Sequence, residues 1–218
     1  QTGLPFNSVI ALELHGGKPL SPLVNAGAIA TTSLINAENV EQRWQRILHI
    51  QQQLAGEQVA LSDEVNQSEQ TTNFHNRAIA WLLYSAGYLY CDAMEACDVY
   101  TRQCSTLLNT IELATLGATL AAGGVNPLTH KRVLQADNVP YILAEMMMEG
   151  LYGRSGDWAY RVGLPGKSGV GGGILAVVPG VMGIAAFSPP LDEDGNSVRG
   201  QKMVASVAKQ LGYNVFKG

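Results

Sequence analysis

The sequence predicts an α+β protein in which a cluster of helices packs beside an antiparallel sheet. Residues 1–150 repeat apolar side chains at helical spacing between capping and turn residues, whereas residues 151–218 contain short apolar runs bounded by glycine and proline. Apolar residues make up 46% of the 218 residues and charged residues only 15%, which is typical of a compact, well-buried protein. We therefore expect a single domain over residues 1–218, with most of its helices in the first 150.

The first part of the chain is expected to form six helices. Asn25 and Asn73 stand where N-cap residues are expected, and Asn109 with Glu112 three positions on matches a capping box. Pro140 suits the first turn of the sixth helix. The fifth helix is apolar on all sides, so we expect it in the middle of the helical cluster. The six expected helices span residues 25–35, 41–54, 73–85, 93–104, 109–122 and 141–149.

The last part of the chain is expected to supply the sheet. Strands are expected over residues 160–164, 170–178 and 181–187, with Pro179-Gly180 as a tight turn between the last two. A helix over residues 198–211 would close the chain. Because both parts lack repeats and low-complexity linkers, we expect them to share one core.

Composition and charge exclude several classes of partner. The net charge is −4, and lysine and arginine are few and dispersed, so nucleic acid is not expected to bind. The longest apolar stretch, residues 174–187, is shorter than the ~20 residues of a membrane-spanning helix and is split by Pro179-Gly180. No membrane association is therefore expected.

The cysteines and histidines argue against a disulfide framework and a metal site. Cys97 and Cys104 are seven residues apart on one expected helix, about 10.5 Å along its axis. A disulfide needs Cα atoms within about 7 Å, so these two cannot pair while the helix holds. With Cys91 they are expected to be buried, reduced thiols of a cytoplasmic protein. The histidines are scattered without the spacing of zinc ligands, and we expect no metal and no other cofactor.

The most informative segment is residues 164–173, Leu-Pro-Gly-Lys-Ser-Gly-Val-Gly-Gly-Gly, which runs into an apolar strand. It places a lysine, a hydroxyl and a row of unhindered backbone N–H groups at the lip of that strand, and converging donors are what an acyl-transfer enzyme needs to hold an oxyanion. Glycines alone would indicate only a loop. The sequence Lys167-Ser-Gly directly before a strand is a more specific signal than the glycines. It resembles the Lys-Thr/Ser-Gly strand edge of serine β-lactamases and penicillin-binding proteins.

A longer match covers nearly the whole chain and closely resembles the bacterial serine-dependent glutaminase family. The matching blocks are Asn25-Ala-Gly-Ala-Ile29, Tyr100-Thr-Arg-Gln-Cys104-Ser105, Tyr152-Gly-Arg-Ser155-Gly156, Lys167-Ser-Gly-Val170, and Ser188-Pro-Pro-Leu-Asp192 with Gly195-Asn-Ser197-Val-Arg-Gly200. The resemblance implies a β-lactamase-like fold and hydrolysis of L-glutamine to L-glutamate and ammonia through an acyl-serine, without a cofactor. It also implies a homo-oligomer, either a dimer or a tetramer.

In that family the nucleophile is the serine of a Ser-x-x-Lys motif upstream of the segment that matches Pro5-Phe6-Asn7-Ser8. The chain begins at Gln1, so we expect it to be part of a longer protein and to be inactive alone. The internal Ser206-Val-Ala-Lys209 lies beside, not within, the apolar stripe expected on the last helix. A surface lysine stays protonated and cannot serve as the base, so we expect a solvated face there.

Tyr152 is the best candidate for proton transfer within the chain. A phenol is a poor base, because its ordinary pKa is near 10, but neighbouring ammonium groups stabilise the phenolate. Lys167 and the lysine of the missing motif could supply that charge. By resemblance, Tyr152 is the general base or proton relay, and the backbone N–H of Val170 is one donor of the oxyanion hole. The alternative for Tyr152 is a structural role at a helix end.

The positions that match the family's substrate-binding residues are Asn25, Glu69, Asn76 and Tyr100, beside Tyr152 and Val170. Glu69 is the expected counter-ion of the glutamine α-ammonium, and Asn76 can accept from the same group. Tyr100 can donate to the α-carboxylate, and Asn25 has both donor and acceptor with which to orient the substrate. Singly, each of these residues also has a structural explanation as a cap, a solvated charge or a core residue.

Two other functions are open. A β-lactamase or transpeptidase would need a Ser-Asp-Asn or Tyr-x-Asn element, and the nearest segment, Ser62-Asp63-Glu64, has glutamate in the third place. A non-catalytic glutamine- or glutamate-binding protein becomes the better interpretation if no Ser-x-x-Lys precedes Gln1.

Overall fold

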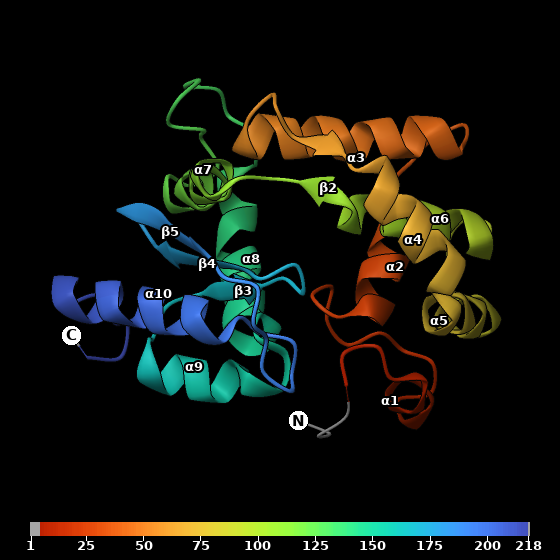
Figure 1. Cartoon of the computed structure of the whole chain (residues 1–218). Helices are drawn as coiled ribbons and strands as arrows, with labels where there is room; N and C mark the ends of the chain where they lie inside the picture. Colours follow the sequence, from red (N-terminus) through yellow and green to blue (C-terminus); the bar gives the residue numbers. More distant parts are fainter. Residues whose placement is uncertain (1–4, 218) are drawn as a thin grey trace. The chain divides into compact units, whose positions relative to one another are not determined.

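The computed structural model describes residues 5–217 and divides the chain into two compact units. The first unit comprises Gln1–Gln51 and Val59–Leu107, and the second comprises Gln52–Gln58 and Leu108–Gly218. Figure 1 shows helices together with antiparallel strands, which confirms the predicted α+β class. The single domain over residues 1–218 stays a prediction.

The first unit is helical, with one short antiparallel ladder in which Ala60 pairs with Leu107. Helix α3 continues from this unit into the second. The elements of the first unit are α1 (Val9–Leu14), α2 (Asn25–Ser33), α3 (Val40–Ala55), β1 (Ala60–Leu61), α4 (Asp63–Thr72), α5 (Phe74–Ser85), α6 (Ala93–Cys104) and β2 (Thr106–Leu107).

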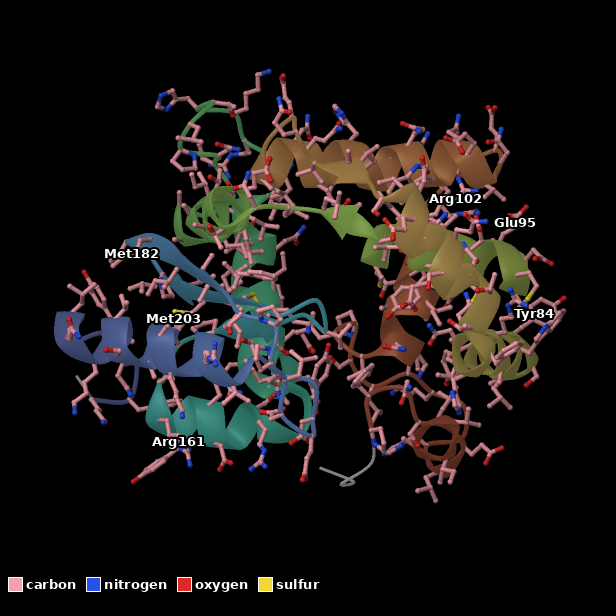
Figure 2. All side chains as sticks on the ribbon, in the orientation of Figure 1. Tyr84, Glu95, Arg102, Arg161, Met182 and Met203 are labelled. Carbon is pink, nitrogen blue, oxygen red and sulfur yellow. The ribbon has the colours of Figure 1, made fainter. Side chains whose placement is uncertain are left out.

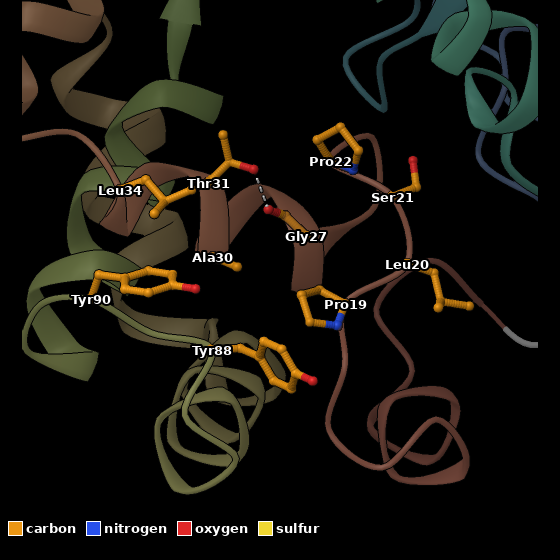
Figure 3. A pocket seen from close by; sticks show the side chains of 10 residues that line it. All are labelled: Pro19, Leu20, Ser21, Pro22, Gly27, Ala30, Thr31, Leu34, Tyr88 and Tyr90. Carbon is orange, nitrogen blue, oxygen red and sulfur yellow. Dashed lines mark hydrogen bonds between the residues drawn. The ribbon is translucent and has the colours of Figure 1, made fainter. Parts of the chain in front are cut away.

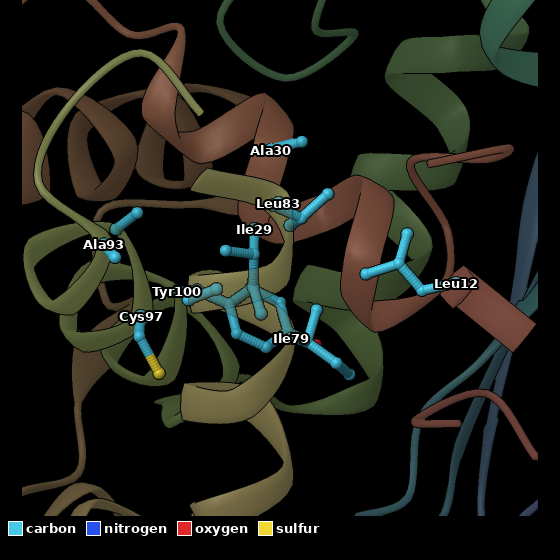
Figure 4. Close-up of a cluster of buried hydrophobic side chains, with 10 residues drawn as sticks. Leu12, Ile29, Ala30, Ile79, Leu83, Ala93, Cys97 and Tyr100 are labelled. Atoms are coloured by element: carbon cyan, nitrogen blue, oxygen red, sulfur yellow. The ribbon is translucent and has the colours of Figure 1, made fainter. Parts of the chain in front are cut away.

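A buried apolar cluster holds α1, α2, α5 and α6 together (Figure 4). Leu12, Ile29, Ile79 and Leu83 are buried in it, and the ring of Tyr100 packs among them. Each fully buried aliphatic side chain contributes about 1.5–3 kcal/mol. The cluster therefore fixes the helices that carry three of the six predicted substrate-binding residues, Asn25, Asn76 and Tyr100.

Helices α1 and α4 were not predicted from the sequence. Helix α1 has only six residues, and α4 buries none of its side chains, so neither shows an apolar stripe. Their starts are set by caps: Ser8 Oγ accepts from the Ala11 N–H at 3.1 Å, and Ser62 Oγ accepts from the Val65 N–H at 3.3 Å.

Of the three predicted asparagine caps, one is wrong and one is right in position only. Val24 is the N-cap residue of α2, and Asn25 is its first helical residue. Asn73 is the N-cap residue of α5 as predicted, but its side chain donates to Thr101 Oγ1 at 3.0 Å and makes no capping bond. The capping box of Asn109 is confirmed. The side chains of Asn25 and Asn73 bond to distant residues instead of local backbone groups.

The second unit packs helices around a three-stranded antiparallel sheet of order β3-β4-β5. Its elements are α7 (Thr110–Ala121), the short 3₁₀ helices η1 (Ala136–Asn138) and η2 (Tyr152–Arg154), α8 (Val139–Glu149), α9 (Ser155–Arg161), β3 (Gly166–Ser168), β4 (Gly173–Val178), β5 (Met182–Phe187) and α10 (Val198–Leu211).

The central strand β4 is buried on both faces. Ile174 and Ala176 point into a cluster with Val204 of α10 and Trp158 of α9, whereas Leu175 lies against α7. This is why the run that follows the glycines is continuously apolar instead of alternating. The register pairs Lys167 with Leu175, so the predicted lysine lies within β3.

The predicted strand 160–164 is wrong, because the chain there ends helix α9. Trp158 and Val162 are one helical turn apart and both enter the buried cluster, so packing favours helix over the β-prone composition. The predicted strand 170–178 begins only at Gly173, and the Pro179-Gly180 turn before β5 is confirmed.

Helix α7 does not lie in the middle of a helical cluster as predicted, but on the sheet, where it covers β5 and β4. Two glycines make the approach close. A Cβ on Gly117 would lie 2.6 Å from Leu175 Cδ1, and a Cβ on Gly183 would lie 2.3 Å from the Ala114 carbonyl oxygen. The all-round apolar character of α7 reflects this backbone-to-backbone contact.

We expect Gly183→Ala to lower the free energy of unfolding by about 1–3 kcal/mol. The new methyl group would overlap backbone atoms of α7, and backbone atoms cannot rotate away as a side chain can. Urea unfolding measures this. Gly156→Ala is the control: Gly156 is exposed on α9 with no atom near its absent Cβ, so alanine should stabilise by about 0.5–1 kcal/mol. Equal stability of the two variants would contradict the close packing of α7.

Helix α10 covers the same length as predicted, but its stripe is only partly buried. Val204 and Ala208 are buried, whereas Met203 (labelled in Figure 2) and Val207 are exposed in part. Ser206 and Lys209 are exposed, as expected of a solvated face. Within the described residues, no helix has the length and apolar character needed to cross a membrane.

The three cysteines are free, but the prediction that all are buried is wrong. Cys97 is buried, Cys91 is partly buried and Cys104 is exposed at the end of α6. Burial raises the pKa of the Cys97 thiol to about 11, so this thiol stays protonated and unreactive at neutral pH.

Candidate active site

Tyr152 and Lys167 are brought together in the second unit. Lys167 Nζ lies 3.4 Å from the Tyr152 hydroxyl and 4.4 Å from the centroid of its ring. It also donates to the carbonyl of Ser168. An ammonium group at this distance favours the phenolate form, which is the arrangement that a proton-transferring tyrosine needs.

The backbone of Tyr152 is strained. Its φ is 53°, in the left-handed region that side chains other than glycine rarely adopt. Such a conformation costs about 1–3 kcal/mol, and it persists only where the surroundings hold it. Ser155 holds one side: its Oγ accepts from the Leu151 N–H and donates to the Tyr152 carbonyl, both at 3.0 Å.

The turn that carries Tyr152 lies directly on β3. The Ser168 N–H donates to the Gly150 carbonyl at 3.0 Å, and a Cβ on Gly150 would lie 1.7 Å from the Gly166 carbonyl oxygen. Glycine at position 150 is therefore required for this approach. The Ser168 hydroxyl, expected at the lip of the strand, is instead buried, and it donates to Asn196 Oδ1 and to the Gly150 carbonyl.

Val170 lies in the turn between β3 and β4, and 57% of it is exposed. Among the described residues its N–H has no hydrogen-bond partner, whereas the N–H groups of Gly169 and Gly172 are both used within the turn. An exposed, unpaired N–H beside the lysine strand is what an oxyanion-hole donor requires.

Because the predicted oxyanion donor is a backbone N–H, we expect Val170→Ala to change kcat by less than about 3-fold. Val170→Pro removes the N–H and should lower kcat by about 10²–10³-fold, the cost of losing one oxyanion donor. Steady-state kinetics on the full-length protein measures both. A large loss in the alanine variant would assign the role to the side chain instead.

Three predicted binding residues form one hydrogen-bonded group in the first unit. The Tyr100 hydroxyl donates to Asn25 Oδ1 at 3.0 Å, and Asn25 Nδ2 donates to Asn76 Oδ1 at 2.7 Å. They come from α6, α2 and α5, three helices joined by the buried cluster. The Nδ2 group of Asn76 is left without a partner among the described residues, and so can donate to a ligand.

Glu69 is not joined to this group. It lies exposed on α4, and its side chain has no ion pair or hydrogen bond within residues 5–217. It is thus an uncompensated carboxylate that is free to meet a cation from solution. Helix α4 packs on α6, which carries Tyr100.

A separate cavity of about 190 Å³ lies in the first unit (Figure 3). Pro19, Ala30, Leu34, Tyr88 and Tyr90 are among its lining residues, which include no carboxylate, amine, imidazole or thiol. It contains none of the predicted site residues. In the part of the chain that the structure describes, no three metal-binding side chains gather at one point.

Ser155 contacts the Tyr152 turn, and no role for it is predicted from the sequence. A serine three positions after a residue in a turn often bonds back to that residue's carbonyl, and this local spacing could have identified it. Nothing local in the sequence could have paired Tyr152 with Lys167, fifteen residues on, because the sheet joins them.

Known proteins resemble this chain in sequence. Residues 1–216 match the family model described as Glutaminase. The curated protein Glutaminase 1 of Escherichia coli O6:H1 is 99% identical over 217 residues, which cover 100% of this chain and 70% of that protein. The chain belongs to the glutaminase family.

Solved glutaminases also share the fold. The crystal structure of a probable Bacillus subtilis glutaminase matches with a TM-score of 0.94 and 34% identity, over 99% of this chain and 72% of that one. A Bacillus subtilis glutaminase in covalent complex with 5-oxo-L-norleucine, formed from 6-diazo-5-oxo-L-norleucine, matches with a TM-score of 0.87 and 31% identity, over 97% and 79%. The predicted β-lactamase-like glutaminase fold is thereby confirmed.

Proposed function

We propose that this glutaminase chain hydrolyses L-glutamine to L-glutamate and ammonia when it is joined to a Ser-x-x-Lys segment that precedes Gln1 in the full-length protein. Family membership supports the reaction, and the Lys167 ammonium against the Tyr152 hydroxyl is the observation that supports the site. The reaction uses protein groups only.

In the first half of the reaction, the serine oxygen bonds to the side-chain carbonyl carbon of glutamine. Tyr152, as phenolate, takes the serine proton and passes it to the leaving nitrogen, and the carbon–nitrogen bond breaks to release ammonia. In the second half, water attacks the acyl carbon. One proton of the water passes through Tyr152 to the serine oxygen, the bond between that oxygen and the acyl carbon breaks, and glutamate leaves.

The Val170 N–H stabilises the oxyanion that forms in both halves, with the N–H of the serine as the second donor. Its exposure and lack of a partner support this role. Lys167 keeps Tyr152 charged between steps. The covalent complex of the Bacillus subtilis glutaminase is consistent with a nucleophile that lies beside the side-chain carbonyl of the substrate.

The group of Asn25, Asn76 and Tyr100, together with Glu69, binds the α-amino acid end of the substrate. Glu69 pairs with the α-ammonium. Because the Tyr100 hydroxyl donates to Asn25 and Asn76 Oδ1 accepts from Asn25, we replace the roles expected from the sequence: the unpaired Nδ2 of Asn76, and not Tyr100, donates to the α-carboxylate. Asn25 orients Asn76, and Tyr100 orients Asn25, through the bonds between them. A site of this kind selects for a free amino acid over a peptide or a β-lactam.

The full-length protein distinguishes this function from the alternatives. We expect ammonia release from L-glutamine and no turnover of nitrocefin, a chromogenic β-lactam. Nitrocefin hydrolysis without glutaminase activity would favour the β-lactamase class. Glutamine binding without turnover of either compound would favour the non-catalytic binding protein.

We also propose a cytoplasmic homo-oligomer. Three free thiols suit a reducing compartment. Phe74, Trp81 and Tyr84 recur at helical spacing on α5, and each is more than half exposed. Figure 2 labels Tyr84. Exposed aromatic side chains of this kind are typical of interfaces. Light scattering should give a dimer or tetramer, and a monomer at micromolar concentration would contradict this.

A further inference from the structure

The loop between β5 and α10 (Figure 1) contains a block that matches the family but has no part in the proposed reaction. The loop is closed by its own hydrogen bonds. Asp192 Oδ1 accepts from the N–H groups of Asp194 at 3.1 Å and Asn196 at 2.9 Å, and the Asp192 N–H donates to the Asn196 carbonyl at 2.8 Å. These bonds give Asn196 a fixed position.

Asn196 is completely buried, and its side chain joins two segments of the site. Its Nδ2 donates to the Leu151 carbonyl at 3.3 Å, and its Oδ1 accepts from Ser168 Oγ at 2.6 Å. Leu151 directly precedes Tyr152, and Ser168 directly follows Lys167. One amide group is therefore bonded to the neighbours of both reactive residues.

This connection matters because the Tyr152 backbone is strained. The bonds made by Ser155 are internal to the turn and do not attach it to the sheet. The turn is attached to β3 by the Ser168 N–H and hydroxyl, which both donate to the Gly150 carbonyl, and by Asn196. Loss of the Asn196 amide would remove the bond to the Leu151 carbonyl, the one of these bonds that lies nearest in sequence to the left-handed Tyr152.

We propose that Asn196 is a positioning residue, which keeps the Tyr152 hydroxyl against the Lys167 ammonium. It acts through Leu151 and Ser168 and does not touch the substrate. This inference rests on the proposed function, since it requires Tyr152 to transfer protons.

The test is the kinetics of Asn196→Ala in the full-length protein. We expect kcat to fall by about 10²-fold, because a small displacement of a proton-transferring group has effects of this size. KM for glutamine should stay within about 3-fold, because Asn196 contacts none of the residues that bind the α-amino and α-carboxylate groups.

Asn126→Ala is the matched control. Asn126 is also buried in the second unit, at 2% exposure, where its Nδ2 donates to the Gln53 carbonyl at 2.8 Å and its Oδ1 accepts from the Leu128 N–H at 2.9 Å. Both variants should lower the melting temperature to a similar extent. The control should keep wild-type kcat, since Asn126 makes no contact with the Tyr152 turn or β3.

An Asn196→Ala variant with the kinetics of the control overturns the proposal. If Asn196→Ala does not fold, Ser168→Ala decides, because it removes the hydroxyl that donates to Asn196. A loss in kcat of about 10-fold at unchanged KM supports the proposal, and wild-type kcat overturns it. Tyr152→Phe is measured in parallel. Normal kcat there would refute the proposed function itself, whereas low kcat there with a normal Asn196→Ala removes only the positioning role.

Discussion

Replacing Tyr152 by phenylalanine should lower kcat for glutamine by about 10²–10⁴-fold, the usual contribution of a general acid–base group. The substitution removes only the hydroxyl, the atom that faces Lys167 Nζ at 3.4 Å. The aromatic ring keeps its packing and its contact with the ammonium, so the fold and the strained turn should persist. KM should change little, because the phenol acts on the reacting amide and not on the α-amino acid end.

Tyr160→Phe serves as the control, since Tyr160 is 83% exposed on α9 and should be kinetically neutral. Quenched-flow analysis adds a second readout: acyl-enzyme formation itself should be slowed in Tyr152→Phe. A variant in which only KM rises would make Tyr152 a binding residue and would contradict the proposed mechanism.

Replacing Glu69 by glutamine should lower kcat/KM for glutamine by about 10- to 100-fold, which corresponds to the ~1.5–3 kcal/mol of a charge-assisted hydrogen bond. Since the Glu69 side chain has no structural partner within the described residues, the melting temperature should not change. The loss should appear mainly in KM, because the ammonium is bound equally in ground and transition states.

Glu64→Gln, on the same exposed helix, tests whether general charge and not a specific contact attracts the substrate. It should retain wild-type kinetics, and high salt should affect it and the wild type alike. Equal losses of kcat/KM in the two variants would mean that Glu69 acts only through the overall negative charge of the surface and not through a specific contact with the substrate.

Local sequence signals predicted the helices and strands well wherever local forces decide. The capping box of Asn109 and the limits of α6 and α10 follow from caps and periodicity, and the structure has them as predicted. Errors occurred where tertiary contacts override local ones. Asn25 is a residue type that often caps helices, but here its side chain bonds to Asn76 and Tyr100. The aromatic residues of α9 favour a strand by composition, and only their packing in the buried cluster shows that they form a helix.

The site residues came from resemblance and not from physical pattern. Nothing in the local sequence links Tyr152 with Lys167, or Asn25 with Tyr100, seventy-five positions apart. The inward direction of the Ser168 hydroxyl and the role of Asn196 were missed for the same reason. Both depend on the packing of the loop between β5 and α10 against β3, and contacts between distant parts of the chain determine that packing.

The most direct test is a crystal structure of the full-length protein after reaction with 6-diazo-5-oxo-L-norleucine. We expect the oxo group of the adduct to accept a hydrogen bond from the Val170 N–H, the Tyr152 hydroxyl to lie within hydrogen-bonding distance of the attacking serine oxygen, and the α-ammonium to pair with Glu69. An adduct whose oxo group faces away from Val170, or whose α-ammonium is bound by other residues, would contradict the assignment of this site.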